Sequence, residues 1–451
     1  MKKFYFVTII MFLSINLFTT FINAQNLYFP PIIGDDWERL TFDELGWDSS
    51  KTEPLYQKLK SDNTKALLIL KDGKLVIEKY FDDFNKDSLW YWASAGKTVT
   101  SFLIGIAKQQ NLLQLTDRTN QYLGEGWTSL PVDKENLITI RHQLTMTTGL
   151  SDDVADPYCT SPECLIYKSD AGDRWAYHNA PYTLLDGVIE SATSKTLNQY
   201  YFNELRNKIG MNGFFMKSGY NNVLYTNARS MARFGLLILN KGNWDTIQIL
   251  SDSAYYREMI NTSQNINLSY GYLWWLNGKE SFMIPQLQLV FNGKFVPSAP
   301  DDMVSGMGSD GQFLNVIPSK NLIVVRMGNA PDNSLVPFLL NEEMWQLINP
   351  IIEPTSLIKD QPNSLNFSLS QNYPNPFNPS TIINFTIPNS GKVTLKIYDV
   401  IGEEVTTLVD EELNPGIYNR EWKASSFSSG IYFYRLQSGD FIETKKMCLI
   451  K

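Results

Sequence analysis

One segment divides this chain into two parts with different sequence patterns. Near residue 352 the sequence becomes polar, punctuated by prolines and only weakly periodic, which is typical of a linker. A chain of 451 residues also exceeds the usual size of one domain. We therefore predict a large domain at residues 25–352, a linker at 353–366 and a small domain at 367–451.

The first residues have the pattern of a secretory signal peptide. Lys2 and Lys3 precede an apolar stretch at residues 4–21, and small residues follow up to Ala24. We predict a signal peptide at residues 1–24; the alternative is an uncleaved membrane anchor, against which polar residues within the stretch argue. No later segment is long and apolar enough to span a bilayer, so we expect no stable membrane span in the mature protein.

Composition indicates a folded, acidic protein. The sequence is 43% hydrophobic, 13% aromatic and 19% charged, which favours a packed core over disorder. Its net charge of -8 repels nucleic-acid phosphates and anionic membranes, and we see no run of basic residues. We therefore predict no nucleic-acid partner.

Cysteine and histidine are scarce. Cys159 and Cys164 lie close together, and in an oxidising compartment they form either a disulfide or two free thiols. Cys448 lies near the end of the chain, and His142 and His178 complete no zinc-binding spacing. We predict no metal site and no cofactor.

The large domain mixes antiparallel strands with helices. Two apolar runs flank Asp72-Gly73 within residues 66–81, which predicts a hairpin, and residues 312–328 predict a second one. From Thr98 onward, apolar residues recur at three- and four-residue steps, as in an amphipathic helix, and further helical patterns occupy 180–195 and 229–241. We predict an α+β fold with an antiparallel sheet flanked by helices.

The small domain has a strand pattern instead. Val393, Leu395 and Ile397 alternate with polar residues, the period expected of a strand buried on one side. Another pair of strand-like runs flanks Gly439. We predict a small all-β sandwich.

Ser94 and Lys97 are the first candidate catalytic residues. They stand three residues apart, at the junction between a loop and the helix that follows, so both lie on one face. A serine hydroxyl needs a base to become a nucleophile, and a lysine at a helix N-terminus is favoured in the neutral form that accepts a proton.

Two competing interpretations of this segment are weaker. A phosphate-binding loop needs a glycine where Tyr91 stands, so that interpretation fails. A Ser-His-Asp triad has few ways to form, because the chain has only two histidines and no nucleophile-elbow motif that we find.

A second candidate element is Tyr177-His178-Asn179. A tyrosine beside a lysine ammonium is expected to have a lowered pKa and to move protons between the nucleophile and the leaving group. Asn179 is expected to position the lysine and the substrate carbonyl, and His178 to face the substrate. For this short motif alone, simple aromatic packing is the alternative.

A third candidate element is the glycine-rich segment 306–312, which runs into an apolar strand. Glycines such as Gly308 let the backbone approach a ligand closely, and the N–H of Ser309 is a candidate partner for the N–H of Ser94 in an oxyanion hole. A plain glycine-rich turn is the alternative.

In this order, the three elements resemble those of the serine β-lactamase and penicillin-binding-protein superfamily. HQLTMTTGL at 142–150 and GYLWW at 271–275 also resemble its class C-like branch, which includes esterases and 6-aminohexanoate-dimer hydrolases. The resemblance covers roughly residues 35–345. It implies an acyl-enzyme on Ser94, an acid/base pair of Lys97 and Tyr177, positioning by Asn179, and an oxyanion donor at Ser309.

The chain departs from that superfamily at one place. Its lactamases and peptidases have Lys-Thr-Gly on a strand, whereas Gly306-Met307-Gly308 stands here. Without that cation, a substrate carboxylate loses a charge-assisted contact of roughly 1.5–3 kcal/mol. We therefore favour a neutral ester or short amide as the small-molecule substrate. Trp90, Trp92, Trp274 and Trp275 either line an acyl pocket or belong to the core.

The small domain also carries a resemblance. YPNPFNPSTIINF, YDVIGEEV and the terminal KKMCLIK are similar to the C-terminal sorting domain of proteins exported by the bacterial type IX secretion system. This implies that residues 367–451 interact with that machinery and that the protein is secreted or displayed on the cell surface. Together, these observations predict an exported serine hydrolase of the esterase or amidase type. The alternatives are a β-lactamase or DD-peptidase, and a non-catalytic surface binding or sensor protein with the same fold.

Overall fold

The structure of the protein, a computed structural model, describes residues 27–331, 334–353, 367–439 and 441–450. The predicted signal peptide and all but the first residue of the predicted linker lie outside the described residues. The chain forms two compact units, divided after Glu353. No helix within the described residues is long and apolar enough to cross a membrane.

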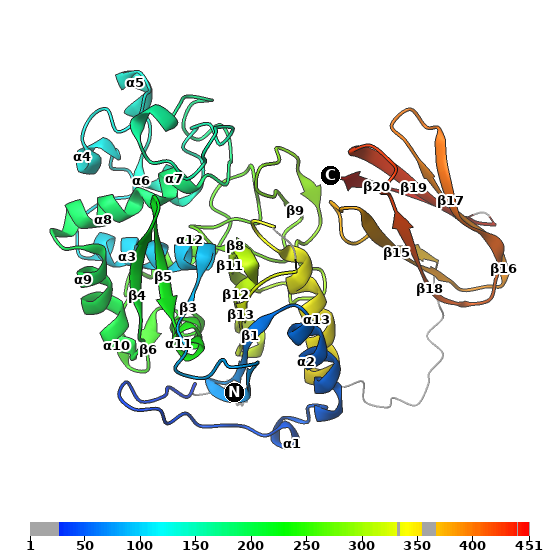
Figure 1. Cartoon of the computed structure of the whole chain (residues 1–451), viewed down its shortest axis with the longest axis horizontal. Helices are drawn as coiled ribbons and strands as arrows, with labels where there is room; N and C mark the ends of the chain where they lie inside the picture. Colours follow the sequence, from blue (N-terminus) through cyan, green and yellow to red (C-terminus); the bar gives the residue numbers. More distant parts are fainter. Residues whose placement is uncertain (1–26, 332–333, 354–366, 440, 451) are drawn as a thin grey trace, which may run out of the picture. The chain divides into compact units, whose positions relative to one another are not determined.

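A six-stranded antiparallel sheet forms the centre of the first unit (Figure 1). Both predicted hairpins are confirmed, and their four strands are adjacent in this sheet. In spatial order the strands are β2 (Lys74–Tyr80), β1 (Thr64–Lys71), β13 (Leu322–Gly328), β12 (Gln312–Ile317), β11 (Val304–Gly308) and β8 (Trp275–Leu276).

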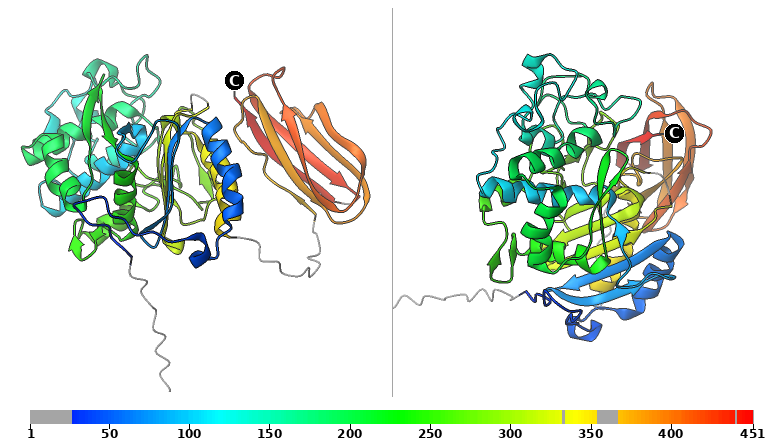
Figure 2. Two further views of the ribbon diagram at one scale, coloured as in Figure 1. Left: turned by 60° about the horizontal axis from the view of Figure 1, so that its bottom comes forward. Right: turned by 60° about the vertical axis from the view of Figure 1, so that its left-hand side comes forward.

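Helices cover both faces of this sheet (Figure 2). One face packs against α11 (Ala228–Leu239), and the other against α2 (Thr52–Ser61) and α13 (Phe338–Ile352). Because neither face meets water, the strands read as nearly continuous apolar runs rather than alternating ones. Residues 66–70 on β1 are all fully buried, for example.

The other helices of the first unit lie mostly beside the sheet. The helix predicted from Thr98 is confirmed as α3, which begins one residue earlier. The bounds are α1 (Phe42–Leu45), α3 (Lys97–Gln109), α4 (Asn120–Leu123), α5 (Val132–Glu135), α6 (Ile140–Leu144), α7 (Asn179–Thr183), α8 (Leu185–Thr193), α9 (Leu197–Tyr201), α10 (Asn207–Ile209) and α12 (Ser253–Met259).

Three small sheets complete the first unit. A three-stranded one includes the strand that leads to Ser94. Its strands are β3 (Trp90–Tyr91), β5 (Asn221–Thr226) and β4 (Phe214–Ser218), and the two-stranded sheets pair β6 (Asn243–Trp244) with β7 (Ile247–Gln248) and β9 (Ser281–Phe282) with β10 (Phe291–Asn292).

The second unit consists of two antiparallel sheets around one apolar core. The predicted alternation is confirmed, since Val393, Leu395 and Ile397 are fully buried while their neighbours are not. One sheet contains β14 (Ser368–Leu369), β15 (Ser380–Ile387) and β18 (Gly416–Lys423), and the other contains β17 (Glu404–Leu413), β16 (Gly391–Tyr398), β19 (Gly430–Ser438) and β20 (Phe441–Leu449). The predicted fold classes are therefore confirmed for both units.

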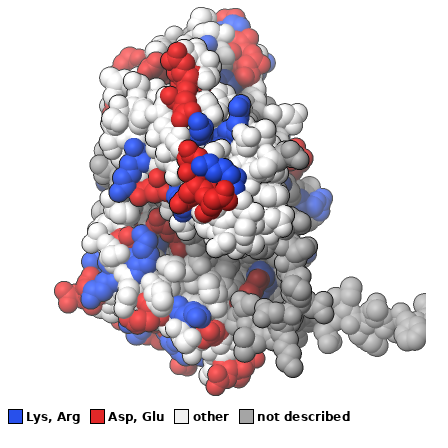
Figure 3. All heavy atoms as spheres, turned by 90° about the vertical axis from the view of Figure 1, so that its right-hand side faces the viewer, with Lys and Arg blue, Asp and Glu red and all other residues white. Residues whose placement is uncertain are grey.

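Charged side chains of both signs are interspersed on the face drawn in Figure 3. Strands β16 and β17 of the second unit follow this pattern, because Lys392 pairs with Asp410 at 2.6 Å and Lys396 with Glu404 at 2.8 Å. Exposed pairs of this kind contribute little to stability, typically ~0–1 kcal/mol, but they keep a β surface hydrophilic.

Candidate active site

Ser94 lies in a short 3₁₀ turn, η2 (Ala93–Gly96), between β3 and α3. Ala93 has a positive φ of 45°, which is unfavourable for a residue with a Cβ and sharpens the turn in front of the serine. The Lys97 ammonium donates to Ser94 Oγ across 3.0 Å. The predicted contact between these two side chains is therefore confirmed. Ser94 is half-buried, so part of the residue is still accessible from solvent.

The surroundings of Lys97 remove its amine from water. The side chain is 3% exposed, and Nζ also donates to Asn179 Oδ1 across 2.7 Å. Burial lowers the pKa of Lys97 to about 7, although the nearby Asp186 carboxylate acts in the opposite direction. About half of the amines are then neutral at pH 7, so Lys97 is able to accept a proton from a hydroxyl.

Tyr177 lies beside Ser94 inside an aromatic cluster. Its ring stacks on Trp275 with centroids 5.8 Å apart and contacts the edge of Tyr270 at 6.2 Å. Burial raises the pKa of the phenol above its ordinary value, although a hydrogen bond with Ser94 lowers it. The expectation of a lowered pKa beside Lys97 is wrong, because loss of hydration has the largest effect on the phenol, and Tyr177 is protonated at neutral pH.

The tryptophans singled out in the sequence are mostly core residues. Trp92, Trp274 and Trp275 are fully buried, and Trp92 Nε1 donates to Thr226 Oγ1 across 2.7 Å. Trp275 nevertheless acts on the site, because its stacked ring fixes Tyr177.

The glycine-rich strand lies directly against the turn of Ser94. A Cβ on Gly308 would be 2.5 Å from the Trp92 carbonyl oxygen and 3.0 Å from the Ala95 nitrogen, so only glycine allows this approach. The next turn, η5 (Ser309–Gly311), also lies against η2. The strand therefore brings Ser309 next to the serine turn, whereas its role as an oxyanion donor stays a prediction.

The strand offers no cation to a substrate. Gly306 has no side chain, and that of Met307 is buried under the sheet at 1% exposure, where Asn341 Nδ2 lies 3.9 Å from its sulfur. The Gly306-Met307-Gly308 triplet, which stands where the superfamily has Lys-Thr-Gly, therefore presents no positive charge on this strand.

His178 is buried between the two polar residues of its motif. Its side chain is 2% exposed, and neither ring nitrogen has a hydrogen-bond partner among the described residues. Burial lowers its pKa to about 4, so the imidazole is neutral at pH 7. Its predicted contact with the substrate stays a prediction.

Sequence reasoning missed two residues near Lys97. The Tyr182 ring centre lies 4.0 Å from Lys97 Nζ, and the Asp186 carboxylate is buried, with Oδ2 accepting from Asn222 Nδ2 across 2.9 Å. Burial raises the pKa of Asp186 to about 7. A helical spacing of three and seven residues after Asn179 was the signal that would have found both.

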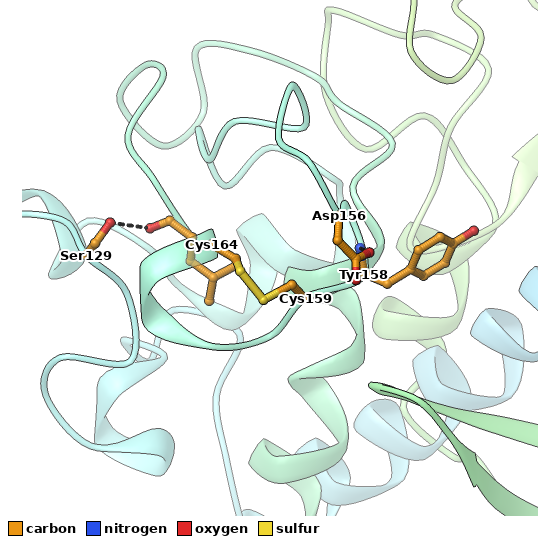
Figure 4. Close-up of a disulfide and its surroundings, with 6 residues drawn as sticks. Ser129, Asp156, Tyr158, Cys159 and Cys164 are labelled. Carbon is orange, nitrogen blue, oxygen red and sulfur yellow. Dashed lines mark hydrogen bonds between the residues drawn. A yellow bond between two sulfur atoms is a disulfide. The ribbon is translucent and has the colours of Figure 1, made fainter.

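Cys159 and Cys164 form a disulfide in the loop before the Tyr177 motif (Figure 4), which is one of the two predicted alternatives. The loop is attached to that motif, since the Ala180 N–H donates to the Pro157 carbonyl oxygen across 3.1 Å. Cys448 in the second unit is buried and free. No group of three or more His, Cys, Asp or Glu side chains in the described part of the chain is arranged to hold a metal ion.

Comparisons with known proteins identify a family model for each of the two units. The family model described as Beta-lactamase matches residues 63–343, and that of the secretion system C-terminal sorting domain matches residues 371–451. No curated protein matches the sequence significantly.

Several solved structures share the fold of the first unit. A protein described as a 6-aminohexanoate-dimer hydrolase from Bacillus anthracis is 19% identical, with a TM-score of 0.56 over 72% of this chain and 90% of that one. A protein described as a beta-lactamase from Bacteroides dorei is 16% identical, with a TM-score of 0.54 over 68% of this chain and 99% of that one. A family VIII carboxylesterase is 12% identical, with a TM-score of 0.52 over 66% of this chain and 96% of that one.

Proposed function

The chain belongs to the beta-lactamase family, and from that premise we propose that it is an exported serine hydrolase acting on ester or amide bonds of small substrates. The observation that carries the proposal is the contact of 3.0 Å between Lys97 Nζ and Ser94 Oγ, made by an amine whose pKa burial lowers to about 7. A buried lysine that only stabilised the fold would gain more from a carboxylate than from a half-buried hydroxyl.

The reaction proceeds through an acyl-enzyme. Ser94 Oγ attacks the substrate carbonyl carbon while its proton passes to the neutral amine of Lys97. The oxyanion accepts hydrogen bonds from the N–H groups of Ser94 and Ser309. When the tetrahedral intermediate collapses, the leaving group takes a proton from the Lys97 and Tyr177 pair. A water molecule then cleaves the acyl-enzyme, which releases the acid and restores Ser94.

The substrate class follows from the charges near Ser94. Because the Gly306–Gly308 strand has no cation, a substrate carboxylate has no partner there, and neutral esters or short amides fit better. Ester and amide hydrolysis occurs on this fold, as the names of a 6-aminohexanoate-dimer hydrolase and a carboxylesterase say, and so does the beta-lactamase description of another protein. The missing cation is what favours an esterase or amidase over a β-lactamase or DD-peptidase.

The sorting domain gives the protein its destination. Residues 371–451 match the model of a secretion sorting domain, so we propose that residues 367–451 interact with the type IX secretion machinery. The signal peptide at residues 1–24 would carry the chain across the inner membrane, and the domain across the outer one. The mature enzyme is then secreted or displayed on the cell surface.

A panel of p-nitrophenyl esters with acyl chains of increasing length tests the enzymatic proposal. We expect the wild type to turn over the short esters and Ser94→Ala to lose roughly 10⁴-fold or more in kcat. Mass spectrometry should find an acyl group on Ser94 when the ester is in excess. Turnover by Ser94→Ala equal to that of the wild type would refute a serine nucleophile. Absence of turnover in both would favour a non-catalytic binding or sensor protein.

Nitrocefin and a fluorescent penicillin distinguish the two enzymatic classes. We expect slow or no hydrolysis of nitrocefin and no stable labelling by penicillin. Efficient hydrolysis would instead identify a β-lactamase, and stable labelling of Ser94 a DD-peptidase.

Export is tested with the full chain in a bacterium that has a type IX secretion system. We expect ester hydrolysis on the cell surface or in the medium, and retention in the periplasm when residues 367–451 are deleted. Surface activity of the deleted protein would contradict the role of this domain.

A further inference from the structure

A single buried arginine holds the turn that carries Ser309. Arg326 on β13 is 0% exposed, and all five of its N–H groups have partners. The partners are Thr64 Oγ1 at 2.9 Å and the carbonyl oxygens of Asp310 at 3.1 Å, Gly311 at 2.7 Å, Asp62 at 2.9 Å and Asn329 at 2.6 Å.

Holding a turn with a buried guanidinium is energetically unfavourable unless its charge is compensated. A buried guanidinium is normally paired with a carboxylate, because removing an unpaired charge from water is unfavourable. Arg326 instead donates to four carbonyls and a hydroxyl, and burial lowers its pKa to about 10. Arg326 donates to two residues of the turn that carries Ser309, which indicates a role beyond filling the core.

Two of the five bonds fix the residues directly after Ser309. Asp310 has a positive φ of 61°, a conformation that is unfavourable in a residue with a side chain. Gly311 has no alternative, because a Cβ there would lie 2.2 Å from Arg326 Nη1. The turn therefore needs external partners to keep its shape.

The same turn is held from the side of the nucleophile. Tyr91, three residues before Ser94, donates its hydroxyl to Asp310 Oδ2 across 2.7 Å. Tyr91 thus links the segment of Ser94 to the turn of Ser309, while Arg326 holds that turn from within the core. The two N–H groups of the oxyanion hole in the proposed function belong to these two segments.

We propose that Arg326 and Tyr91 are positioning residues that hold the 309–311 turn so that the Ser309 N–H points at the oxyanion. The proposal rests on the proposed function, in which Ser94 is the nucleophile and Ser309 an oxyanion donor. In this role, neither side chain needs to contact the substrate. Both act on the transition state through the backbone, whose displacement by about 1 Å is sufficient to cost up to 10²-fold in rate.

The test compares two buried arginines of the full-length protein. Arg326→Gln and Arg326→Lys are compared with Arg233→Gln. Arg233 is a suitable control because it is also buried, at 5% exposure, and also donates to backbone carbonyls, those of Ile209 at 2.9 Å and Pro31 at 2.7 Å. The measurements are the unfolding temperature, kcat and KM for the best p-nitrophenyl ester, and Kd for phenylboronic acid, which forms a tetrahedral adduct on a reactive serine.

We expect Arg326→Gln to lower kcat by about 10- to 100-fold while KM stays within threefold of the wild-type value. Its affinity for phenylboronic acid should fall by a similar factor. Arg326→Lys should recover part of both. Arg233→Gln should lower the unfolding temperature while kcat and the Kd stay within twofold of the wild type. Equal loss of kcat in the Arg233 and Arg326 variants, or no loss in either, would overturn the proposal.

Tyr91→Phe covers the case in which Arg326 variants do not fold. It removes one hydroxyl at a half-buried position, and we expect roughly a threefold loss in kcat and in boronic acid affinity. If Tyr91→Phe leaves both unchanged, the positioning role of this turn is overturned. These outcomes remain separate from the proposed function, because that fails only if the wild type shows no turnover dependent on Ser94.

Discussion

The two sides of the candidate site are built by different physical means. On the helix side, Lys97, Tyr177 and Asn179 meet through side chains in a desolvated cluster. On the strand side, the close approach is made by backbone: Gly306, Gly308 and Gly311 have no side chain, Met307 is buried, and Asp310 accepts from Tyr91. The helix side therefore controls protons through burial, whereas the strand side controls distance through close packing.

This difference predicts different responses to mutation. A change on the helix side should alter protonation and the pH profile with little effect on geometry. A change on the strand side should alter geometry and leave the pH profile in place. The predictions below examine this division, from the largest expected effect to the smallest.

Replacing the base should have the largest effect. Lys97→Met removes the proton acceptor while keeping an apolar chain, and we expect kcat/KM for a p-nitrophenyl ester to fall by roughly 10³–10⁴-fold. The matched control is Lys108→Met on the same helix. Lys108 forms an ion pair with Asp252 at 2.6 Å and does not contact Ser94. Similar losses in the two variants would contradict a specific role for Lys97.

The same substitution should stabilise the protein at neutral and low pH. The pKa of Lys97 is lowered to about 7 on folding, so the unfolded chain binds more protons between about pH 7 and 10.5. Stability of the wild type should therefore rise with pH across that window. Urea unfolding at several pH values should show a smaller rise for Lys97→Met. An identical slope in both proteins would mean that Lys97 is not the group responsible.

Removing the phenol should have the next largest effect. Tyr177→Phe keeps the ring stacked on Trp275 but loses the proton route to the leaving group, and we expect about a 10²-fold loss in kcat. Tyr255→Phe is the control, because this equally buried phenol donates to the Ser101 carbonyl oxygen at 2.6 Å. The loss should shrink for esters with better leaving groups, and a loss independent of the leaving group would argue against proton donation by Tyr177.

A methyl group on the strand should act through distance alone. In Gly308→Ala the new Cβ would lie 2.5 Å from the Trp92 carbonyl oxygen, whereas in Gly306→Ala its nearest neighbour, Thr98 Cγ2, is 3.1 Å away. We expect about a 10- to 100-fold loss in kcat for Gly308→Ala, a much smaller one for Gly306→Ala, and the same apparent pKa in both pH profiles. A shifted pH profile would break the division between the two sides.

The smallest effect is expected from Asp186. The Lys97 amine faces the side-chain oxygens of Ser94 and Asn179 and the rings of Tyr177 and Tyr182. Among the described residues, the Asp186 carboxylate is the charged group that acts on the pKa of this amine. Asp186 raises the pKa of Lys97, so Asp186→Asn should move the acidic limb of the kcat/KM profile to lower pH. Exposed Asp133→Asn should leave the limb in place. Movement to higher pH would reverse the assigned sign.

Local sequence patterns were sufficient for much of the fold and part of the site. A hairpin with a turn dipeptide, an amphipathic helix and strands with strict alternation are determined by neighbouring residues, and each is present as predicted. The contact between Ser94 and Lys97 is equally local, because three residues at a helix start place both side chains on one face.

Other features of the site depend on segments far apart in the chain. The direction of the Tyr177 pKa was predicted wrongly, because it depends on burial by Trp275 and Tyr270, about 100 residues away. The role of Arg326 had no local signal either, since an arginine within an apolar strand shows no partner until the chain has folded.

By itself, the sequence determined the two-part organisation, the order of the three motifs and the spacing that brings a serine to a lysine. The tertiary structure alone decided that the lysine is buried, that the phenol stays protonated and that a glycine strand packs against the turn of Ser94. The reason is that chain geometry acts over a few residues, whereas desolvation and close packing depend on every atom that surrounds a site, wherever it lies in the sequence.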